Sequence, residues 1–402
     1  MGVVVTGWGA VTPLGGNAAD SWQAVAAGRD AAAPVPPALF DVSGCRATQT
    51  ASALLPDLPD VAPRALRRLS RASRLALPAA REALEMAGLL DRSHCRSVLP
   101  ELALSASTTG GGMAFGEEFL RRRLKKQRGG ADVLRYLPQQ QVADLQQFLG
   151  LGGPAYIVAN ACASGANALG HGADLILSGE AGCVLAGGFE ALTELIFDGF
   201  DSLQATTTEK CRPFDINRTG LLLGEGAAFF VLESEEHAAA RGAAPLCRLA
   251  GYGHTTDFFH LTQPNPEGKA LAEAMARACA RAGVSPSEIG YVNAHGTATP
   301  LNDGAEAAAY RAFFGGDLEK TRVSSTKAAI GHTLGAAGAI EALFAIQALR
   351  TGVLPPQLNV ETPLPEIAAV LARPDETRSL SHVLSVNLGF GGSNAALLFS
   401  RA

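Results

Sequence analysis

Short apolar runs along this chain alternate with longer segments in which apolar residues recur at helical spacing. In the second half the pattern predicts strands at residues 246–250, 289–293 and 321–325, helices at 270–282, 305–314 and 335–349, and a closing hairpin at 383–387 and 395–399. In the first half it predicts strands at residues 3–6, 102–106, 155–158, 183–186 and 227–232. Because strands that alternate with helices indicate βαβ units, we expect an α/β fold whose sheets are covered on both faces.

The alternation restarts at about residue 245, which indicates an internal duplication, although the two parts are not visibly similar in sequence. We therefore predict two pseudo-duplicated halves, an N-terminal half at residues 1–240 and a C-terminal half at residues 241–402. Residues 30–63 are rich in alanine and proline and should form an irregular surface segment.

The composition is that of a large globular protein. Of its 402 residues, 47% are hydrophobic and 18% are charged, so the chain can bury a sizeable core. No apolar run is long enough to span a membrane and the N-terminus has no positively charged leader, so we expect a cytoplasmic protein without a membrane partner. The net charge of −5 argues against general nucleic-acid binding.

The seven cysteines, at positions 45, 95, 162, 183, 211, 247 and 279, are scattered and never spaced as Cys-x-x-Cys. We therefore expect neither a disulfide framework nor a metal site.

Two glycine-rich stretches follow predicted strands. Gly7 and Gly9 come after the first strand, but the third glycine of a dinucleotide-binding loop and a helix directly after it are missing, so we reject that interpretation. Glycines at 110–112 follow the strand at 102–106 and indicate close backbone approach or room for a ligand.

Cys162 has the surroundings of a nucleophile. It follows the predicted strand at 155–158 and precedes small residues at helical spacing, so it stands at a strand-to-helix turn. A helix N-terminus offers unpaired N–H groups and partial positive charge, which lower the pKa of a thiol and can hold an oxyanion. The alternative is a small buried cysteine that only fills space.

Two histidines also follow strands. His295 comes just after the strand at 289–293, and His332 follows the strand at 321–325 with Lys327 between them. Because α/β proteins assemble their sites past the C-terminal ends of strands, two histidines, a lysine and a helix-start cysteine favour a reactive site over a structural role. A glycine loop at 389–394 could supply a backbone N–H to an oxyanion.

Two basic runs stand out in a chain that is acidic overall. They contain Arg64, Arg67 and Arg68, and then Arg121, Arg122, Arg123, Lys125 and Lys126. Each run alone is typical of a solvated helix, but two together indicate a docking face for an acidic partner.

Four motifs occur in a fixed order along the chain. They are Ala161-Cys162-Ala163-Ser164-Gly165, His295-Gly-Thr-Ala-Thr-Pro300, Lys327 with Gly331-His332-Thr-Leu-Gly-Ala-Ala-Gly338, and Gly389-Phe-Gly-Gly-Ser-Asn394. In all four the chain resembles the β-ketoacyl-acyl-carrier-protein synthases of the thiolase superfamily, above all the type II elongating enzymes and their relatives in polyketide and polyene pathways. The resemblance implies a thiolase-like five-layer αβαβα fold and a Cys-His-His site. It also implies a homodimer, or a heterodimer with a ketosynthase-like chain-length factor.

Joining two thioesters requires an acyl group held on the enzyme and a carbanion generated beside it. The thiolate of Cys162 would take the acyl chain from acyl carrier protein. When malonyl-carrier loses carbon dioxide, its developing enolate needs hydrogen-bond donors, a role that suits His295 and His332. The backbone N–H of Cys162 would then hold the oxyanion of the condensation step.

The resemblance assigns further roles. It places the Phe390 N–H in the oxyanion hole. It implies that Lys327 orients or charge-tunes His332 and that Glu341 supports this lysine. It also implies that the pantetheine arm is held by Thr297 and Thr299, and that the acyl pocket is bounded by Gly110, Phe200 and Phe390. Apart from the phosphopantetheine that the carrier brings, it implies no cofactor and no metal.

Some positions depart from the family's pattern. Asn160 and Ala163 replace the Thr and Ser that are more common around the nucleophile, and Gly110 stands where a larger residue often bounds the acyl pocket, which suggests a longer or differently shaped pocket. Three functions are open: fatty-acid elongation, the catalytic subunit of a ketosynthase–chain-length-factor pair that makes a polyene or polyketide, and a non-catalytic chain-length partner. The intact set of reactive groups argues against the third.

Overall fold

The computed structural model describes residues 2–59, 61–90, 99, 101–128 and 130–402, and its elements fall into two series. The first series is β1 (Val3–Val11), α1 (Ala18–Ala26), β2 (Ala33–Pro34), β3 (Gln49–Thr50), α2 (Pro63–Leu66), α3 (Arg71–Met86), β4 (Ala103–Ser107), α4 (Met113–Leu124), α5 (Pro138–Leu149), β5 (Ala155–Val158), α6 (Ser164–Leu177), β6 (Cys183–Glu190), α7 (Glu194–Ser202), β7 (Gly226–Ser234) and α8 (Glu235–Ala240). The second is β8 (Cys247–Thr256), α9 (Lys269–Ala282), β9 (Ile289–Asn293), α10 (Pro300–Phe314), β10 (Arg322–Ser324), α11 (Lys327–Ile330), α12 (Ala337–Thr351), β11 (His382–Gly389) and β12 (Ser393–Ser400).

The two series build the same sheet twice. The strand order is β10-β9-β11-β12-β8-β1-β7-β6-β4-β5, so each half has its strands in one relative order, with β1, β4, β5, β6 and β7 matching β8, β9, β10, β11 and β12. The pairings agree as well, because β6–β7 and β11–β12 are antiparallel whereas β4–β6 and β9–β11 are parallel. Within the sheet, the halves pair through Val4 with Arg248 and Val5 with Cys247, between β1 and β8. This confirms the predicted duplication, while the boundary at 240/241 as a domain limit stays a prediction.

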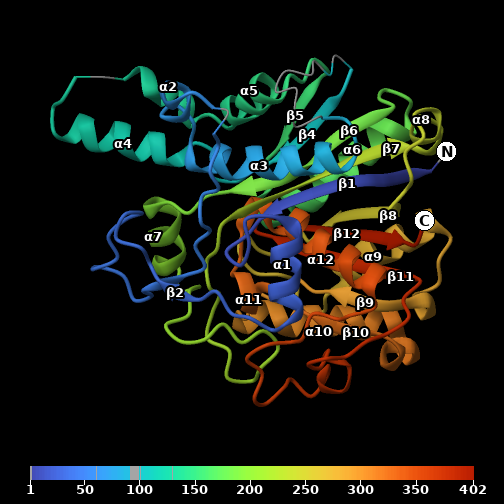
Figure 1. Ribbon diagram of the computed structural model, residues 1–402. Coiled ribbons are helices and arrows are strands. Elements are labelled where there is room, and N and C mark those ends of the chain that lie inside the picture. Colours follow the sequence, from blue (N-terminus) through green and yellow to red (C-terminus); the bar gives the residue numbers. More distant parts are fainter. Residues whose placement is uncertain (1, 60, 91–98, 100, 129) are drawn as a thin grey trace.

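Helices cover both faces of each half-sheet (Figure 1). α3 and α5 pack on the outer face of the first half, α9 and α10 on the outer face of the second, and α6 and α12 lie together between them. Every residue of α12 from Ala337 to Ile346 is buried, as expected for a helix surrounded by sheet and helix on all sides. The predicted five-layer αβαβα arrangement is therefore confirmed. None of the described helices is long and apolar enough to cross a membrane.

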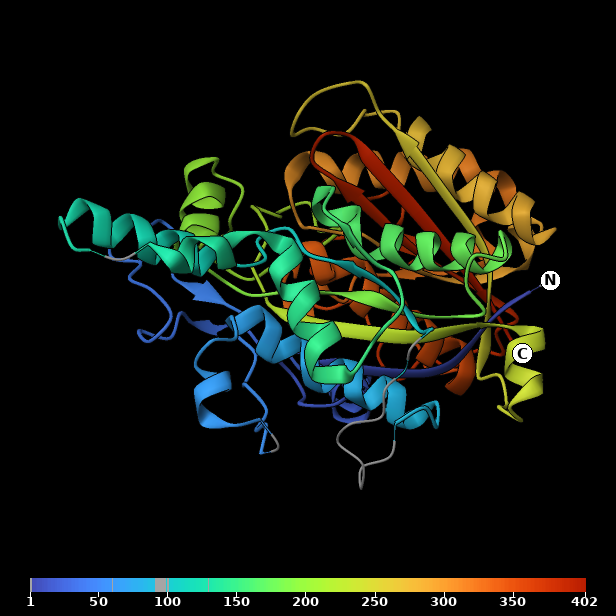
Figure 2. The ribbon, with the colours of Figure 1, turned by 90° about the horizontal axis from the view of Figure 1, so that it is seen from above.

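One part of the first half extends away from these layers. α4 reaches out at the end of the molecule opposite the two chain termini (Figures 1 and 2). No residue of α4 is buried, and the helix packs mainly against a short 3-10 helix, η1 (Ala131–Tyr136), with a smaller contact to α7. The segment at residues 64–74 is divided between α2 and the start of α3, where Ser70 caps α3 by accepting the N–H of Ser73. The described residues between 30 and 62 are irregular as predicted, apart from the two-residue strands β2 and β3.

The glycines of the rejected dinucleotide motif have a packing role. Gly9 faces α3 so closely that a Cβ there would lie 2.2 Å from the Ala79 carbonyl oxygen. In the second half Gly253 of β8 meets α9 in the same way, with a Cβ position 2.1 Å from the Ala274 oxygen. In both halves the absence of a side chain at this position lets the strand backbone lie directly against the helix backbone.

These contacts predict matched losses of stability. Gly9→Ala and Gly253→Ala should each lower the free energy of unfolding by about 1–3 kcal/mol, because the new methyl must push a helix backbone outward. Gly44→Ala is the control, since no atom lies within 4 Å of a Cβ at that position. Denaturant unfolding of the three variants checks this, and a loss in Gly44→Ala as large as in the other two would contradict the packing account.

Candidate active site

The turn that carries Cys162 connects β5 to α6 through a short 3-10 helix, η2 (Ala161–Ala163). Ala161 lies in the left-handed region at φ +56°, which is unfavourable for a residue with a side chain. Ser164 holds the turn, because its hydroxyl accepts the N–H of Asn160 at 2.8 Å and donates to the Ala161 carbonyl at 2.5 Å. The predicted strand-to-helix position of Cys162 is confirmed, and its side chain lines a pocket although the residue is only 6% exposed.

His295 follows β9 and is held through its backbone. The Glu306 carboxylate on α10 accepts the N–H groups of His295 at 2.6 Å and Gly296 at 2.7 Å. Burial raises the pKa of Glu306 to about 7, partly offset by hydrogen bonds from the Tyr310 hydroxyl and the Gly296 N–H. Sequence reasoning missed Glu306, although an acid in the first turns of a helix that follows a glycine loop is a recognisable signal.

His332 follows α11, and its backbone is held by the segment at residues 222–224 of the same chain. Its backbone N–H donates to the Leu222 carbonyl at 2.6 Å, and its carbonyl accepts the Gly224 N–H at 3.0 Å. Its ring Nδ1 accepts the N–H of Leu334 at 3.3 Å. The ring therefore has one nitrogen occupied by a donor.

Lys327 is the centre of a buried polar group. Its ammonium forms an ion pair with Glu341 of α12, and the other oxygen of that carboxylate accepts the Asn387 amide at 2.6 Å. The remaining contact runs to Nδ1 of His295 at 3.3 Å. The lysine thus hydrogen-bonds His295 rather than orienting His332 as expected, although its charge lowers the pKa of both histidines.

These contacts give both histidines one protonation state. Burial first, and then the Lys327 charge, hold both pKa values well below the usual value, so both rings are neutral. Because donors face Nδ1 in each ring, the remaining proton resides on Nε2. The ring centroids lie 5.3 Å apart at 88°, and both rings line the pocket that contains Cys162. The pocket therefore holds two neutral N–H donors beside a thiol.

The thiol itself differs from the sequence-based expectation. Burial raises the pKa of Cys162 to about 12, and the positive charge of Lys327 and the backbone N–H of Phe390, which faces the sulfur, offset this only in part. The prediction of a lowered pKa is wrong, because desolvation of the thiolate outweighs the helix start. Cys162 is therefore mainly the protonated thiol at rest.

The pocket over these groups has a volume of about 390 Å³. Thr297 and Thr299 line it and share a hydrogen bond of 2.9 Å between their hydroxyls. Phe200 and Phe390 also line it, with their rings stacked at a centroid distance of 5.8 Å. The loop at residues 257–264, which sequence reasoning missed, forms part of the wall.

Gly110 does not line this pocket. A Cβ at Gly110 would lie 2.6 Å from Cδ1 of Ile196, so a side chain from α7 already fills the space that the glycine leaves. The expectation that Gly110 lengthens the pocket is therefore not met in this chain. A buried carboxylate, Glu190, instead fixes the loop by accepting the N–H groups of Thr109 and Gly110 at 2.7 and 2.8 Å.

The first basic run lies on α2 and directly after it, and the second lies at the end of α4 and directly after it. Arg135 of η1 donates to the Arg68 carbonyl, which links the segment after α2 to the segment after α4. Arg121 is paired with Glu194 and Arg122 with Glu118. The remaining predicted docking cations have exposed side chains: Arg64, Arg67, Arg68, Arg123, Lys125 and Lys126.

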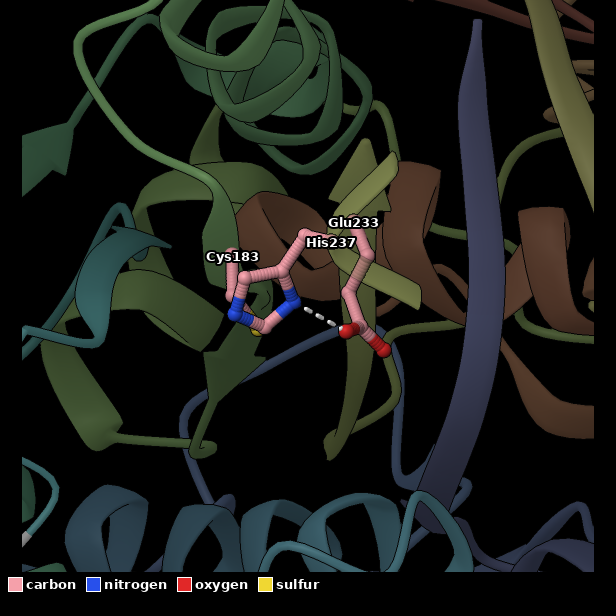
Figure 3. A group of neighbouring side chains, drawn as sticks. All are labelled: Cys183, Glu233 and His237. Atoms are coloured by element: carbon pink, nitrogen blue, oxygen red, sulfur yellow. Dashed lines mark hydrogen bonds and ion pairs between the residues drawn. The ribbon is translucent and has the colours of Figure 1, made fainter. Parts of the chain in front are cut away.

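A second cluster of potential ligand atoms lies elsewhere. In the described part of the chain, Cys183, Glu233 and His237 place their ligand atoms within 4.8 Å of one another (Figure 3). The Glu233 carboxylate already shares a hydrogen bond of 2.6 Å with Nδ1 of His237, and the Arg241 guanidinium donates to both carboxylate oxygens. Because a guanidinium neutralises this carboxylate, the cluster is explained as an ion-pair network. The expectation of no metal and no cofactor stays a prediction. The described cysteines are free thiols, and Cys95 lies outside the described residues.

The fold and the site together define a thiolase-like condensing enzyme in which Cys162 and the neutral rings of His295 and His332 share one pocket. The family models "Beta-ketoacyl synthase, N-terminal domain" and "Beta-ketoacyl synthase, C-terminal domain" match residues 1–238 and 246–361. The chain belongs to the β-ketoacyl synthase family of acyltransferases.

Individual relatives cover the whole chain. It is 34% identical to 3-oxoacyl-[acyl-carrier-protein] synthase 2 of Coxiella burnetii (strain RSA 493 / Nine Mile phase I), over 99% of this chain and 98% of that protein. The structure titled "The ishigamide ketosynthase/chain length factor" superposes with a TM-score of 0.91 at 30% identity, covering 100% of this chain and 99% of the other. A type II PKS ketosynthase solved in complex with its acyl-carrier protein gives a TM-score of 0.88 at 26% identity, covering 100% and 99%.

The buried lysine predicts a change in histidine titration. In the double variant Lys327→Met/Glu341→Gln the pKa values of His295 and His332 should rise, because the positive charge that lowers them is gone and no unpaired carboxylate remains. Titration of the histidine ring resonances by NMR measures this, with Lys320→Met as a surface control. The single variant Lys327→Met should also lose about 3–5 kcal/mol of stability, because it leaves Glu341 buried without its partner. Unchanged histidine pKa values in the double variant would mean that burial alone keeps the rings neutral.

Proposed function

We propose that this chain is a β-ketoacyl-acyl-carrier-protein synthase that elongates fatty acyl chains by decarboxylative condensation with malonyl-carrier. The observation that carries the proposal is the pocket in which Cys162, His295 and His332 meet, with the Phe390 N–H facing the sulfur. This arrangement brings together a thiol that can accept an acyl group, two ring N–H groups that can donate hydrogen bonds to an enolate, and a backbone N–H that can donate one to an oxyanion.

In the first half-reaction Cys162 attacks the thioester carbon of acyl-carrier. The acyl–sulfur bond to the carrier breaks, the new bond to Cys162 forms, and the proton of the thiol ends on the carrier's thiol. The tetrahedral oxyanion is held by the backbone N–H groups of Cys162 and Phe390. Since the resting thiol is protonated, proton departure and attack are coupled in this step.

In the second half-reaction the carboxylate of malonyl-carrier leaves as carbon dioxide, and its electron pair becomes the enolate. The Nε2–H groups of His295 and His332 stabilise the enolate oxygen. The enolate carbon attacks the acyl-Cys162 carbonyl, the bond to sulfur breaks, and Cys162 recovers one proton from solvent. The Lys327 charge helps to keep both rings neutral, and its hydrogen bond orients the His295 ring. Thr297 and Thr299 hold the pantetheine arm.

A second candidate is the catalytic subunit of a ketosynthase–chain-length-factor pair that makes a polyene or polyketide. The TM-score of 0.91 to the ishigamide ketosynthase/chain length factor supports it. A non-catalytic partner role is disfavoured, because all four reactive side chains are present and assembled. In either catalytic role Phe200 and Phe390, which line the pocket, bound the acyl chain.

The partners in this proposal are acyl carrier protein and a second ketosynthase-like chain. The solved complex of a related ketosynthase with its carrier supports the first, and the exposed basic side chains near α2 and α4 provide charge for an acidic carrier. Edge strand β5 supports the second, because its outer backbone groups are unpaired in the sheet and Tyr156 is 36% exposed. The partner chain is either identical or a chain-length factor. A cytoplasmic location remains part of the proposal.

Separating the two half-reactions tests the division of roles. His295→Ala and His332→Ala should each slow release of labelled carbon dioxide from malonyl-carrier by about 10²–10³-fold, because an enolate donor is lost. Acyl loading of Cys162, followed by intact mass, should fall much less. Cys162→Gln should lose condensation yet keep or enhance decarboxylation, because its amide resembles an acylated thiol. Decarboxylation at the parent rate in the histidine variants, or condensation by Cys162→Gln, would show that these roles are wrongly assigned.

Charge reversal tests carrier docking. The combined variant Arg64→Glu/Arg67→Glu/Arg123→Glu/Lys125→Glu should lower kcat/KM for malonyl-carrier by roughly ten- to a hundredfold at low salt and flatten its salt dependence, because steering of an acidic partner is lost. Alkylation of Cys162 by iodoacetamide should stay unchanged, and Lys320→Glu serves as the control for an exposed lysine elsewhere. If turnover and alkylation fall together, the basic runs support the fold rather than the carrier.

A further inference from the structure

Two separate segments build the oxyanion hole, the Cys162 turn at residues 160–163 and the turn between β11 and β12 that holds Phe390. Within the described residues, the side-chain hydrogen bonds that join these neighbourhoods end on one atom, the hydroxyl oxygen of Ser393. Asn160 donates to it at 3.1 Å from the Cys162 turn, and Asn167 donates at 3.5 Å from the first turns of α6. Ser393 is thus a single anchor between the two parts of the hole.

The position of Ser393 sets the position of the Phe390 N–H. Ser393 begins β12 and pairs with Gly389 across the hairpin, so the two residues enclose the turn that carries Phe390. Gly391 and Gly392 close this turn in the left-handed region at φ +83° and +85°. Two backbone hydrogen bonds also hold this turn, from the Gly391 N–H to the Leu261 carbonyl at 2.7 Å and from the Asp257 N–H to the Gly392 carbonyl at 2.8 Å. Neither of them reaches the Cys162 turn, so the alignment of the two parts of the hole depends on the residues that enclose this turn.

The other enclosing residue cannot hold the turn by a side chain. The backbone of Gly389 packs closely against the Cys162 turn, since a Cβ at Gly389 would lie 3.2 Å from the backbone nitrogens of Cys162 and Ala163. This close approach puts the Phe390 N–H over the sulfur, but it is a packing contact without direction. The hydrogen bonds to Ser393 are the directional side-chain contacts that tie this turn to the Cys162 neighbourhood.

The two asparagines differ in how they are held. The Tyr252 hydroxyl donates to Oδ1 of Asn167 at 2.7 Å, which turns the Asn167 amide nitrogen toward Ser393. Asn160 belongs to the Cys162 turn itself, and its Oδ1 is buried without a hydrogen-bond partner among the described residues. A buried acceptor without a partner lowers stability, so the favourable contact of this side chain must come from its amide nitrogen. That side is bonded to Ser393.

We propose that Asn160 is a positioning residue for acyl transfer, which through Ser393 holds the Phe390 N–H on the Cys162 sulfur. This rests on the proposed role of Cys162 as the acylated nucleophile. The amide of Asn160 reaches from the Cys162 turn to the Ser393 hydroxyl, 3.1 Å away.

The test compares two reactions of the same thiol. Attack of Cys162 on a small acyl thioester, butyryl-N-acetylcysteamine, creates an oxyanion that needs the Phe390 N–H, whereas alkylation by iodoacetamide displaces iodide and creates none. Both reactions need the thiolate, and neither uses the carrier. In Asn160→Ala and in Ser393→Ala the acylation rate should fall about tenfold, less than the loss of a whole oxyanion donor. Alkylation, followed by peptide mapping of Cys162, should stay within about twofold of the parent.

Two controls make the result specific. Ser400→Ala, at the far end of the same strand, should change neither rate. The double variant Asn160→Ala/Ser393→Ala should lose no more than Ser393→Ala alone, because the bond from Asn160 is already absent in that single variant. A parallel fall of acylation and alkylation, or an unchanged acylation rate, overturns the proposal. Absence of acylation at Cys162 in the parent protein would instead refute the proposed function.

Discussion

The first turns of the two central helices touch backbone to backbone, and the active site depends on this crossing. A Cβ at Gly165 would lie 2.6 Å from the nitrogen of Ala339, and one at Gly338 would lie 2.3 Å from the nitrogen of Ala166. Only glycine permits such an approach. As a result the Cys162 turn, which precedes α6, lies beside the segment that leads into α12 and carries His332. A larger residue at either glycine would separate the nucleophile from the histidines.

The crossing also explains how the chain duplicates a turn and uses the copies differently. Each central helix has its glycine at the second position and is preceded by a three-residue 3-10 helix, η2 before α6 and η5 (Leu334–Ala336) before α12. Ala161 and Leu334 open these turns with φ values of +56° and +50°. At the next position the first copy has Cys162 and the second has Gly335, where a Cβ would lie 2.5 Å from the Thr109 nitrogen. One copy therefore provides the nucleophile, and the other provides close packing around it.

Burial at this crossing determines the charges of the site. Lys327 and Glu341 are 1% and 2% exposed at their side chains and neutralise each other, with Asn387 completing the carboxylate's contacts. Once this pair is in place, the same low-polarity surroundings lower the pKa of both histidines and raise the pKa of Cys162. The site rests as neutral thiol and neutral imidazoles, a state in which no unpaired charge is buried.

The sequence by itself determined the features that depend on local pattern: the alternating strands and helices, the restart near residue 245, and the turns that carry Cys162, His295, His332 and Phe390. These follow from hydrophobic periodicity, glycine placement and short motifs, which act over a few neighbouring residues. What the tertiary structure decided depends on contacts between distant segments. It decided that desolvation outweighs the helix start at the thiol, that Lys327 faces His295, that Ile196 fills the space beside Gly110, and that Ser393 joins the two parts of the oxyanion hole. Burial and side-chain direction are set by the packing of all the layers together, so no local stretch of sequence contains them.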